Sequence, residues 1–166
     1  MTALDALKFD NSFAELPATL HRSVAPTSIA NPVRAVVSLD CAALLDLDTT
    51  DSTRWLQCFS GQKLAPGMSP IAQKYTGHQF GVYNPELGDG RGVLLGEVIN
   101  QHDERWDLHL KGAGQTPFSR MGDGRAVLLS SLREFFPSAP LHHPGVPTTR
   151  ALRVLVPDAP LTPDTP

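Results

Sequence analysis

The sequence contains little cysteine and no surplus of positive charge. Its 166 residues include two cysteines, Cys41 and Cys58, which have neither C-x-x-C spacing nor histidines at zinc-finger distance. We therefore expect two reduced, buried thiols, with no disulfide and no metal site. The net charge of −3 provides no bulk attraction to nucleic acid or to an anionic membrane, so any affinity for phosphate must be local.

Long apolar runs are also missing. The sequence has no run of about 18 apolar residues and no charged-then-apolar leader at its start. These two features favour a soluble, cytoplasmic protein. With 166 residues, 41% of them hydrophobic, the chain is large enough for one globular domain with its own core, and membership of a larger whole stays open.

Three regions of the chain differ in pattern. Residues 1–70 combine scattered apolar residues, prolines and two short helical stretches at 41–47 and 52–59, which predicts an N-terminal wrapping segment with short helices, Ser52 capping the second. Residues 71–136 hold the regular core. Residues 137–166 contain eight of the chain's 15 prolines, which predicts a divergent tail, extended or disordered past Val156.

Within the central region the periodicity changes from strand-like to helical. Residues 93–99 and 106–111 are separated by a polar turn, and apolar residues alternate with polar ones in the second run, so we expect an antiparallel hairpin. Apolar residues at three- and four-residue steps predict a helix over 126–136, with Asp123 or a neighbour as its N-cap. Pro137 and Pro140 predict that this helix ends near Phe136. The fold class is therefore α+β, with an antiparallel sheet and a helix that carries Glu134.

Glycine gathers on both sides of the second predicted strand. The clusters are 88–92, 112–114 and 122–124, and arginines stand at 91, 120 and 125. Glycine lets backbone amides approach an anion closely, so this composition, with Lys111 at a strand end, indicates a polyphosphate site. The Walker and Rossmann spacings are absent, and plain turns between strands remain an alternative for each cluster.

Lys111 and Glu134 stand 23 residues apart, one at a predicted strand end and the other on the following helix. In protein kinases a strand lysine contacts the nucleotide phosphates and is held by a glutamate of the next helix. The alternative is an ordinary surface lysine and a solvated glutamate. His78 and His109 have no metal-ligand spacing around them, and we expect both to be structural.

At these positions the chain closely resembles the selenoprotein O family of protein adenylyltransferases, whose fold is pseudokinase-like. The motifs are specific to that family, and the resemblance runs from about residue 9 to about residue 155. The matching stretches are Phe9-Asp-Asn-Ser-Phe13, Phe59-Ser-Gly61, Pro66-Gly-Met68, Tyr75-Thr-Gly-His-Gln-Phe-Gly-Val82, Leu87-Gly-Asp-Gly-Arg-Gly92, Leu95-Gly-Glu-Val98, Trp106-Asp-Leu108, Leu110-Lys-Gly-Ala-Gly114, Thr116-Pro117, Met121-Gly-Asp-Gly-Arg-Ala-Val127, Arg133-Glu-Phe135 and Gly145-Val-Pro-Thr-Thr-Arg-Ala151.

The resemblance implies the N-terminal lobe of a protein-kinase-like (pseudokinase) fold. It also implies transfer of AMP from ATP to Ser, Thr or Tyr hydroxyls of protein substrates, with the nucleotide in reversed orientation. Carried over by position, the site residues divide into four roles: Gly88, Gly90 and Arg91 line the nucleotide site, Lys111 contacts phosphate, Asp123 and Gly124 form a second wall, and Glu134 pairs with Lys111.

The resemblance also marks what this sequence does not contain. The family's proton-accepting Asp and its Mg²⁺ ligands belong to a C-terminal lobe beyond residue 166, so the resemblance implies ATP and Mg²⁺ as cofactors but places no catalytic base or metal ligand here. Leu129 stands where the family usually has Arg. We expect this chain alone to be inactive, and the alternative is a non-catalytic nucleotide-binding or interaction module, or the remnant of a truncated gene.

Overall fold

The computed structural model describes residues 1–158, so the part of the predicted tail at 159–166 lies outside the described residues. The chain forms three α-helices, two short 3-10 helices and seven strands in that range. In chain order these are η1 (Leu4–Ala6), η2 (Ser12–Glu15), β1 (His21–Ser23), β2 (Pro32–Val37), α1 (Leu39–Leu44), α2 (Ser52–Phe59), β3 (Ile71–Gln79), β4 (Val82–Gly88), β5 (Gly92–Ile99), β6 (Arg105–Lys111), α3 (Leu128–His142) and β7 (Arg153–Pro157).

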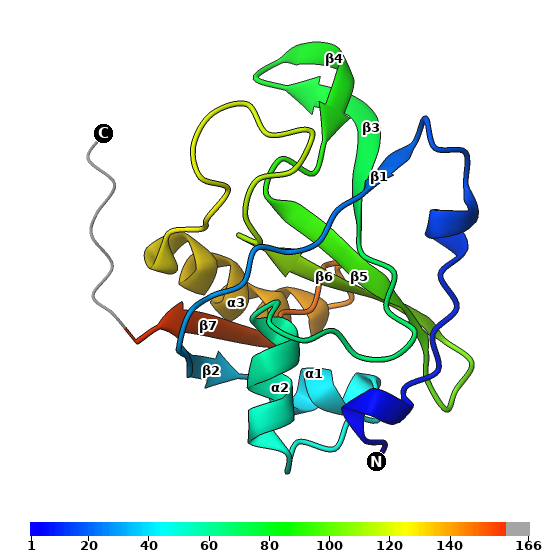
Figure 1. Cartoon of the computed structure of the whole chain (residues 1–166), viewed down its shortest axis with the longest axis vertical. Helices are drawn as coiled ribbons and strands as arrows, with labels where there is room; N and C mark the ends of the chain where they lie inside the picture. The colour runs from blue at the N-terminus through cyan, green and yellow to red at the C-terminus, as the bar shows by residue number, and fades with distance from the viewer. Residues whose placement is uncertain (159–166) are drawn as a thin grey trace.

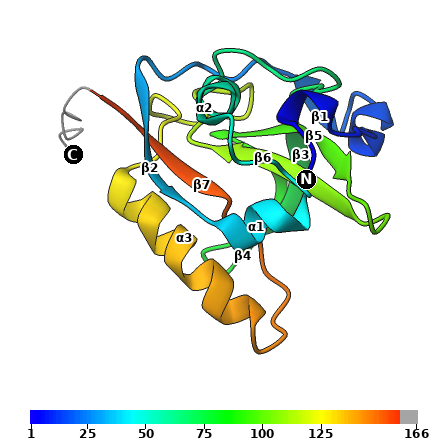
Figure 2. The same cartoon turned by 90° about the horizontal axis from the view of Figure 1, so that it is seen from below.

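The strands form two antiparallel sheets (Figure 1). The larger has the order β1-β3-β5-β6, with β4 paired to β3, and the smaller is the pair β2-β7. Helix α3 runs along the β2-β7 pair, as Figure 2 shows from below. The predicted α+β class with an antiparallel sheet is confirmed.

The β5-β6 hairpin is the centre of the larger sheet, and its prediction is confirmed. Its register runs from Gly92 opposite Lys111 to Ile99 opposite Arg105, with a bulge between Leu94 and Gly96. Seven of the eight positions of β5 are buried, and its apolar side chains meet those of α1, α2 and the N-terminal residues in one core. Because β6 pairs with this buried strand in a defined register, the position of β5 also sets the position of Lys111 at the end of β6.

The N-terminal segment is tied to the sheet through the carboxylate of Glu97. This side chain is buried and accepts hydrogen bonds from the Ser12 hydroxyl at 2.8 Å and the Phe13 amide at 2.6 Å. Asn11 completes the attachment by accepting a bond from the Glu97 amide at 3.0 Å. A buried carboxylate is tolerated when it is hydrogen-bonded, and here its partners come from the wrapping segment and from Arg105 of β6, which donates to Oε1 at 3.3 Å.

Helix α2 begins and ends where the sequence predicts, but its cap differs. The Asp51 carboxylate accepts from the Arg54 amide at 2.9 Å, so Asp51, rather than Ser52, is the N-cap. Both cysteines are free and buried, as expected, and burial raises the pKa of the Cys58 thiol to about 11.

Helix α3 differs most from its prediction. It continues to His142 through Pro137 and Pro140, so the expected end near Phe136 is wrong. Both prolines are exposed, and the carbonyls of Arg133 and Phe136 that lose their amide donors also belong to exposed residues, where water can bond to them. On the opposite side the buried Ser138 hydroxyl donates to the Phe135 carbonyl at 2.8 Å and so supports the same turn.

The predicted cap of α3 is also wrong. Val127 occupies the N-cap position without a side-chain hydrogen bond, while the Asp123 carboxylate accepts from the Arg125 amide at 2.8 Å. The β3-β4 hairpin was not predicted from the sequence, and it turns at Phe80 and Gly81, both with positive φ. Within residues 1–158, none of the helices has the length and apolar character needed to cross a membrane.

Candidate functional site

Lys111 and Glu134 form an ion pair between the end of β6 and the middle of α3. The Lys111 ammonium donates to the Glu134 carboxylate, as the 23-residue spacing predicts, so that prediction is confirmed. Both side chains remain about half exposed, at 46% and 53%. The pair is therefore open to solvent and to a ligand rather than sealed in the core.

The glycine clusters meet beside Lys111. Gly92 is the strand partner of Lys111, and the Arg91 carbonyl accepts from the amides of Gly112 at 2.8 Å and Ala113 at 3.1 Å. The Gly114 amide donates to the Gly124 carbonyl at 3.2 Å, which brings the third cluster to the second. Chain segments that are far apart in sequence thus form one continuous backbone surface next to the ion pair.

The first cluster, which contains Gly88 and Gly90, lies under the loop at 116–119. Thr116 donates through Oγ1 to the Asp89 carbonyl at 2.5 Å, and the Ser119 hydroxyl donates to the Gly90 carbonyl. A Cβ on Gly88 would lie 2.5 Å from Cγ of Phe118, so a side chain there would displace the ring. Close packing against this loop is one reason for glycine at 88.

Asp89 of the first glycine cluster and His109 of β6 form a polar cluster that was not predicted from the sequence. The Asp89 carboxylate lies 3.2 Å from His109 Nε2 and accepts from the Gln73 amide at 3.0 Å. Burial alone would raise the pKa of Asp89, but the hydrogen bonds from His109 and Gln73 outweigh it and lower the pKa. The alternation in β6 puts His109 on the same side as Lys111, but it does not indicate Asp89 as the partner of His109.

The three arginines of the predicted phosphate site have different surroundings. Arg125 donates to the carbonyls of Thr27 at 2.9 Å, Ser28 at 2.9 Å and Gly112 at 3.3 Å, so it fastens the N-terminal segment to the second glycine cluster. Arg120 donates to Gln79 Oε1 at 2.8 Å.

Arg91 differs from these two, because its guanidinium is exposed and makes one long bond within residues 1–158, 3.4 Å to the Arg125 carbonyl. Arg91 is therefore the arginine best placed to meet a ligand. The expectation that all three point at phosphate is not supported, because the Arg125 donors bond to backbone carbonyls.

A sequence profile for the protein adenylyltransferase SelO matches residues 3–166. The chain belongs to the SelO family. The match covers almost the whole sequence, including the three glycine clusters, Lys111 and Glu134.

Individual relatives share more than half of the residues. The protein nucleotidyltransferase YdiU of Azotobacter vinelandii is 56% identical over 163 residues, which cover 97% of this chain and 34% of that protein. The protein of the same name from Pseudomonas putida is 57% identical over 157 residues, covering 93% of this chain and 32% of its own length. The chain thus spans about a third of the length of the curated relatives it matches.

A cavity of this SelO-family chain reaches the glycine clusters only at Gly112. It has a volume of about 890 Å³ and lies between β6, α3 and residues 148–157. Of the seven predicted site residues it is lined by two, Lys111 and Glu134. The glycine surface is the better candidate for a phosphate site, because the exposed Arg91 belongs to it and Lys111 adjoins it, whereas this cavity is lined mainly by apolar side chains.

The Mg²⁺ that the family resemblance implies needs several oxygen ligands at one point. Within residues 1–158, no three His, Cys, Asp or Glu side chains are grouped closely enough to hold a metal ion. The Glu134 carboxylate is paired with Lys111, and that of Asp123 accepts from the Arg125 amide. The described residues do not fit a Mg²⁺ site.

Proposed function

We propose that this chain supplies the ATP-phosphate-binding part of a SelO-family protein nucleotidyltransferase, built as the N-terminal lobe of a kinase-like fold. The observation that carries the proposal is the Lys111–Glu134 ion pair beside the joined glycine clusters. The order of the parts supports it: a glycine cluster, a strand, a strand ending in lysine, and a helix with glutamate follow one another as in a kinase lobe.

The chemistry of the proposed site follows from these contacts. Glu134 holds the Lys111 ammonium in place, and a half-exposed ammonium can approach phosphate oxygens as a point charge. Arg91 can add a planar pair of donors from the first cluster. We assign Gly88 and Gly90 to the wall next to Arg91, and Asp123 and Gly124 to the opposite wall.

The proposed reaction is the transfer of AMP to a protein hydroxyl of Ser, Thr or Tyr. The hydroxyl oxygen attacks the α-phosphorus, the bond to the β-phosphate oxygen breaks, pyrophosphate leaves, and the hydroxyl proton passes to a base. We assign that base and the ligands for Mg²⁺ to the two thirds of the longer relatives that this chain does not span. When bound, Mg²⁺ would neutralise phosphate charge.

A non-catalytic nucleotide-binding module is the second candidate. It is favoured by the absence of a group of metal-ligating side chains within residues 1–158. Both candidates require ATP binding through Lys111, and they differ in whether AMP is transferred.

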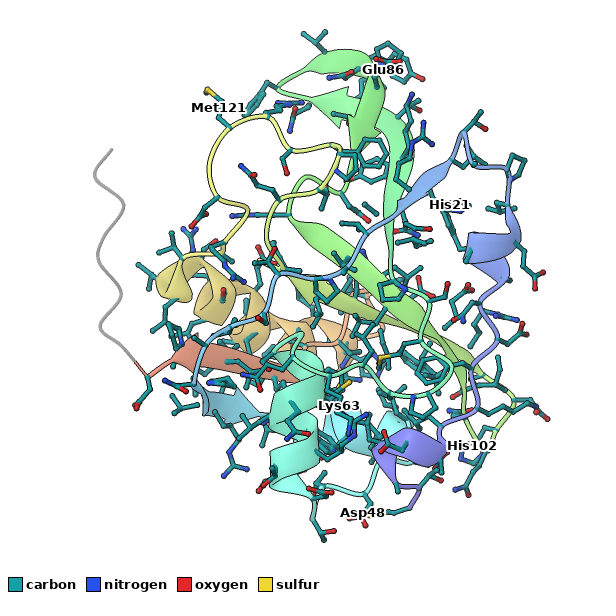
Figure 3. All side chains as sticks on the ribbon, in the orientation of Figure 1. His21, Asp48, Lys63, Glu86, His102 and Met121 are labelled. Carbon is teal, nitrogen blue, oxygen red and sulfur yellow. The ribbon has the colours of Figure 1, made fainter. Side chains whose placement is uncertain are left out.

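ATP binding is the first experiment. We expect weak binding, measured by ligand-observed NMR or calorimetry, and a loss of about tenfold in affinity for Lys111→Ala, because a charged hydrogen-bond partner of phosphate is removed. Lys63→Ala is the matched control, since Lys63 lies beside α2 (Figure 3). Equal affinities of the two variants would contradict the proposal.

AMP transfer is the second experiment. The purified chain is incubated with ATP labelled in the α-phosphate, a generic protein acceptor and Mg²⁺. We expect no label on protein, because the described residues provide no group for the metal. Metal-dependent label that disappears in Lys111→Ala would instead show that the chain is a complete transferase.

A further inference from the structure

Two hydroxyl groups hold consecutive carbonyls of the first glycine cluster. The Thr116 hydroxyl donates to the Asp89 carbonyl at 2.5 Å, and the Ser119 hydroxyl donates to the Gly90 carbonyl. Both hydroxyls belong to the loop at 116–119, and the two bonds join residues that are 27 and 29 positions apart in sequence. This loop therefore fixes the direction in which each of the two carbonyls points.

The other contacts of these hydroxyls determine which group donates. The Thr116 hydroxyl accepts from the Phe118 amide at 3.1 Å, and the Ser119 hydroxyl accepts from the Thr116 amide at 2.8 Å. A hydroxyl has one hydrogen to donate, and a carbonyl can only accept. Each hydroxyl thus uses a lone pair within its own loop and its hydrogen on the glycine cluster.

The direction of a carbonyl also sets the direction of the next amide. In a trans peptide unit the N–H points opposite to the C=O, so the amides of Gly90 and Arg91 point away from the 116–119 loop. The Asp89 amide donates to the Gln73 carbonyl at 2.9 Å, whereas the amides of Gly90 and Arg91 make no hydrogen bond within residues 1–158. Two successive amides are therefore available to a ligand.

The surroundings of these two amides favour an anion. The Arg91 side chain is exposed, and Lys111 is the strand partner of Gly92, the next residue of the cluster. Successive amides beside cationic side chains are typical of anion sites. A phosphate group is therefore the ligand expected at the Gly90 and Arg91 amides.

We propose that Thr116 and Ser119 are positioning residues for the proposed phosphate site. Each hydroxyl holds one peptide unit so that its amide faces the phosphate and its carbonyl faces the loop. The peptide dipole makes this orientation important, because a carbonyl oxygen turned toward the phosphate would repel it. The inference rests on the proposed function, since it requires phosphate to bind at the first glycine cluster.

The two hydroxyls act on different amides. The Asp89 carbonyl and the Gly90 amide belong to one peptide unit, and the Gly90 carbonyl and the Arg91 amide belong to the next. Loss of the Thr116 hydroxyl should therefore disturb the Gly90 amide, and loss of the Ser119 hydroxyl should disturb the Arg91 amide. A role confined to the packing of the loop would not separate these two effects.

The test is an NMR titration of the complete chain, labelled with ¹⁵N, with ATP and with inorganic tripolyphosphate. In the unmodified chain we expect both ligands to shift the signals of the Gly90 and Arg91 amides. Thr116→Val keeps the shape of the side chain and removes the hydroxyl, so the shift at Gly90 should shrink. Ser119→Ala should reduce the shift at Arg91. We expect each variant to bind either ligand about fivefold more weakly, as for the loss of one hydrogen bond.

Two further variants separate the hydroxyl from the rest of the side chain. Thr116→Ser keeps the hydroxyl and loses the methyl group, so we expect it to bind as the unmodified chain does. Thr53→Val makes the same chemical change as Thr116→Val at an exposed position of α2, and we expect no effect on binding. Urea denaturation checks that each variant is folded, and Ser119→Ala provides the same test if Thr116→Val does not fold.

Several results would overturn the inference. Unchanged affinity and unchanged amide shifts in folded Thr116→Val and Ser119→Ala would show that the hydroxyls do not position the cluster. Equal weakening in Thr116→Ser would assign the effect to the methyl group, and weakening for ATP but not for tripolyphosphate would assign it to the nucleoside. Failure of the proposed function is distinguishable: ATP would leave both amides unshifted in the unmodified chain, and Lys111→Ala would not weaken binding, which would overturn the inference as well.

Discussion

Gly124 lies directly on the backbone of Gly114. A Cβ on Gly124 would be 2.1 Å from the Gly114 carbonyl carbon, and Gly124 has a φ of +75°. The contact joins the second and third glycine clusters, and it leaves no room for any side chain at 124. Gly124 is therefore needed for the shape of the proposed site.

Substitution of these glycines tests the contact. Gly122 also has a positive φ, +92°, but nothing lies within 4 Å of its Cβ position. We expect Gly122→Ala to lower the free energy of unfolding by about 1 kcal/mol, from backbone strain alone. Gly124→Ala adds a collision with backbone and should lower it further. Urea denaturation compares the two variants, and equal midpoints would show that the contact is absent.

The Lys111–Glu134 pair should contribute little to stability. Exposed ion pairs contribute about 0–1 kcal/mol, and both side chains here are about half exposed. In a double-mutant cycle of Lys111→Ala and Glu134→Gln we expect a coupling below about 1 kcal/mol, whereas either change weakens ATP binding. A coupling free energy well above this value would mean that the pair mainly stabilises the fold. The exposure of its two side chains would then not indicate a role in ligand binding.

Asp89 should make stability depend on pH in the acid range. Its pKa in the folded chain lies below the usual value of 3.8, so its contribution is present above that value and is lost as the pH falls through the lower folded pKa. We expect Asp89→Asn to destabilise the chain at pH 7 and to differ less from the unmodified chain at pH 2–3. Thermal denaturation across this range measures the difference, with the exposed Glu15→Gln as control.

Pro140 should weaken the helix that contains it. Alanine at this position would restore an amide donor to the Phe136 carbonyl, and we expect Pro140→Ala to raise the free energy of unfolding by about 1–3 kcal/mol. Pro144→Ala is the control, because Pro144 follows the end of α3 at His142. Hydrogen exchange should show protected amides from Ser138 to Leu141. Fast exchange of these amides would show that the helix ends near Phe136, as the sequence predicts.

Some of the site could be predicted because its signals are local. The alternation in β6 and the glycine at its end place Lys111, and the helical period places Glu134 on the next element. The Asp89–His109 cluster could not be found in this way, because it depends on how β3, β5 and β6 pair.

The course of α3 depends on tertiary contacts rather than on local propensity. Pro137 and Pro140 predict a helix end, but the buried Ser138 hydroxyl also accepts from the Ala151 amide at 3.4 Å and so ties this turn to the segment before β7. Arg125 is a similar case. Its composition-based assignment to phosphate fails because its partners, Thr27 and Ser28, are nearly a hundred residues away in sequence.

The attachment of the wrapping segment to Glu97 has a consequence for synthesis. Phe13 and Glu97 are 84 residues apart, so residues 12 and 13 leave the ribosome long before their acceptor in β5 has emerged. The β5-β6 hairpin is local in sequence and can form early, whereas docking of residues 11–13 closes a long loop and comes later. Until then Phe9, which packs on Gly96 and Gly67, is uncovered, so a nascent-chain chaperone would find an apolar target around Phe9.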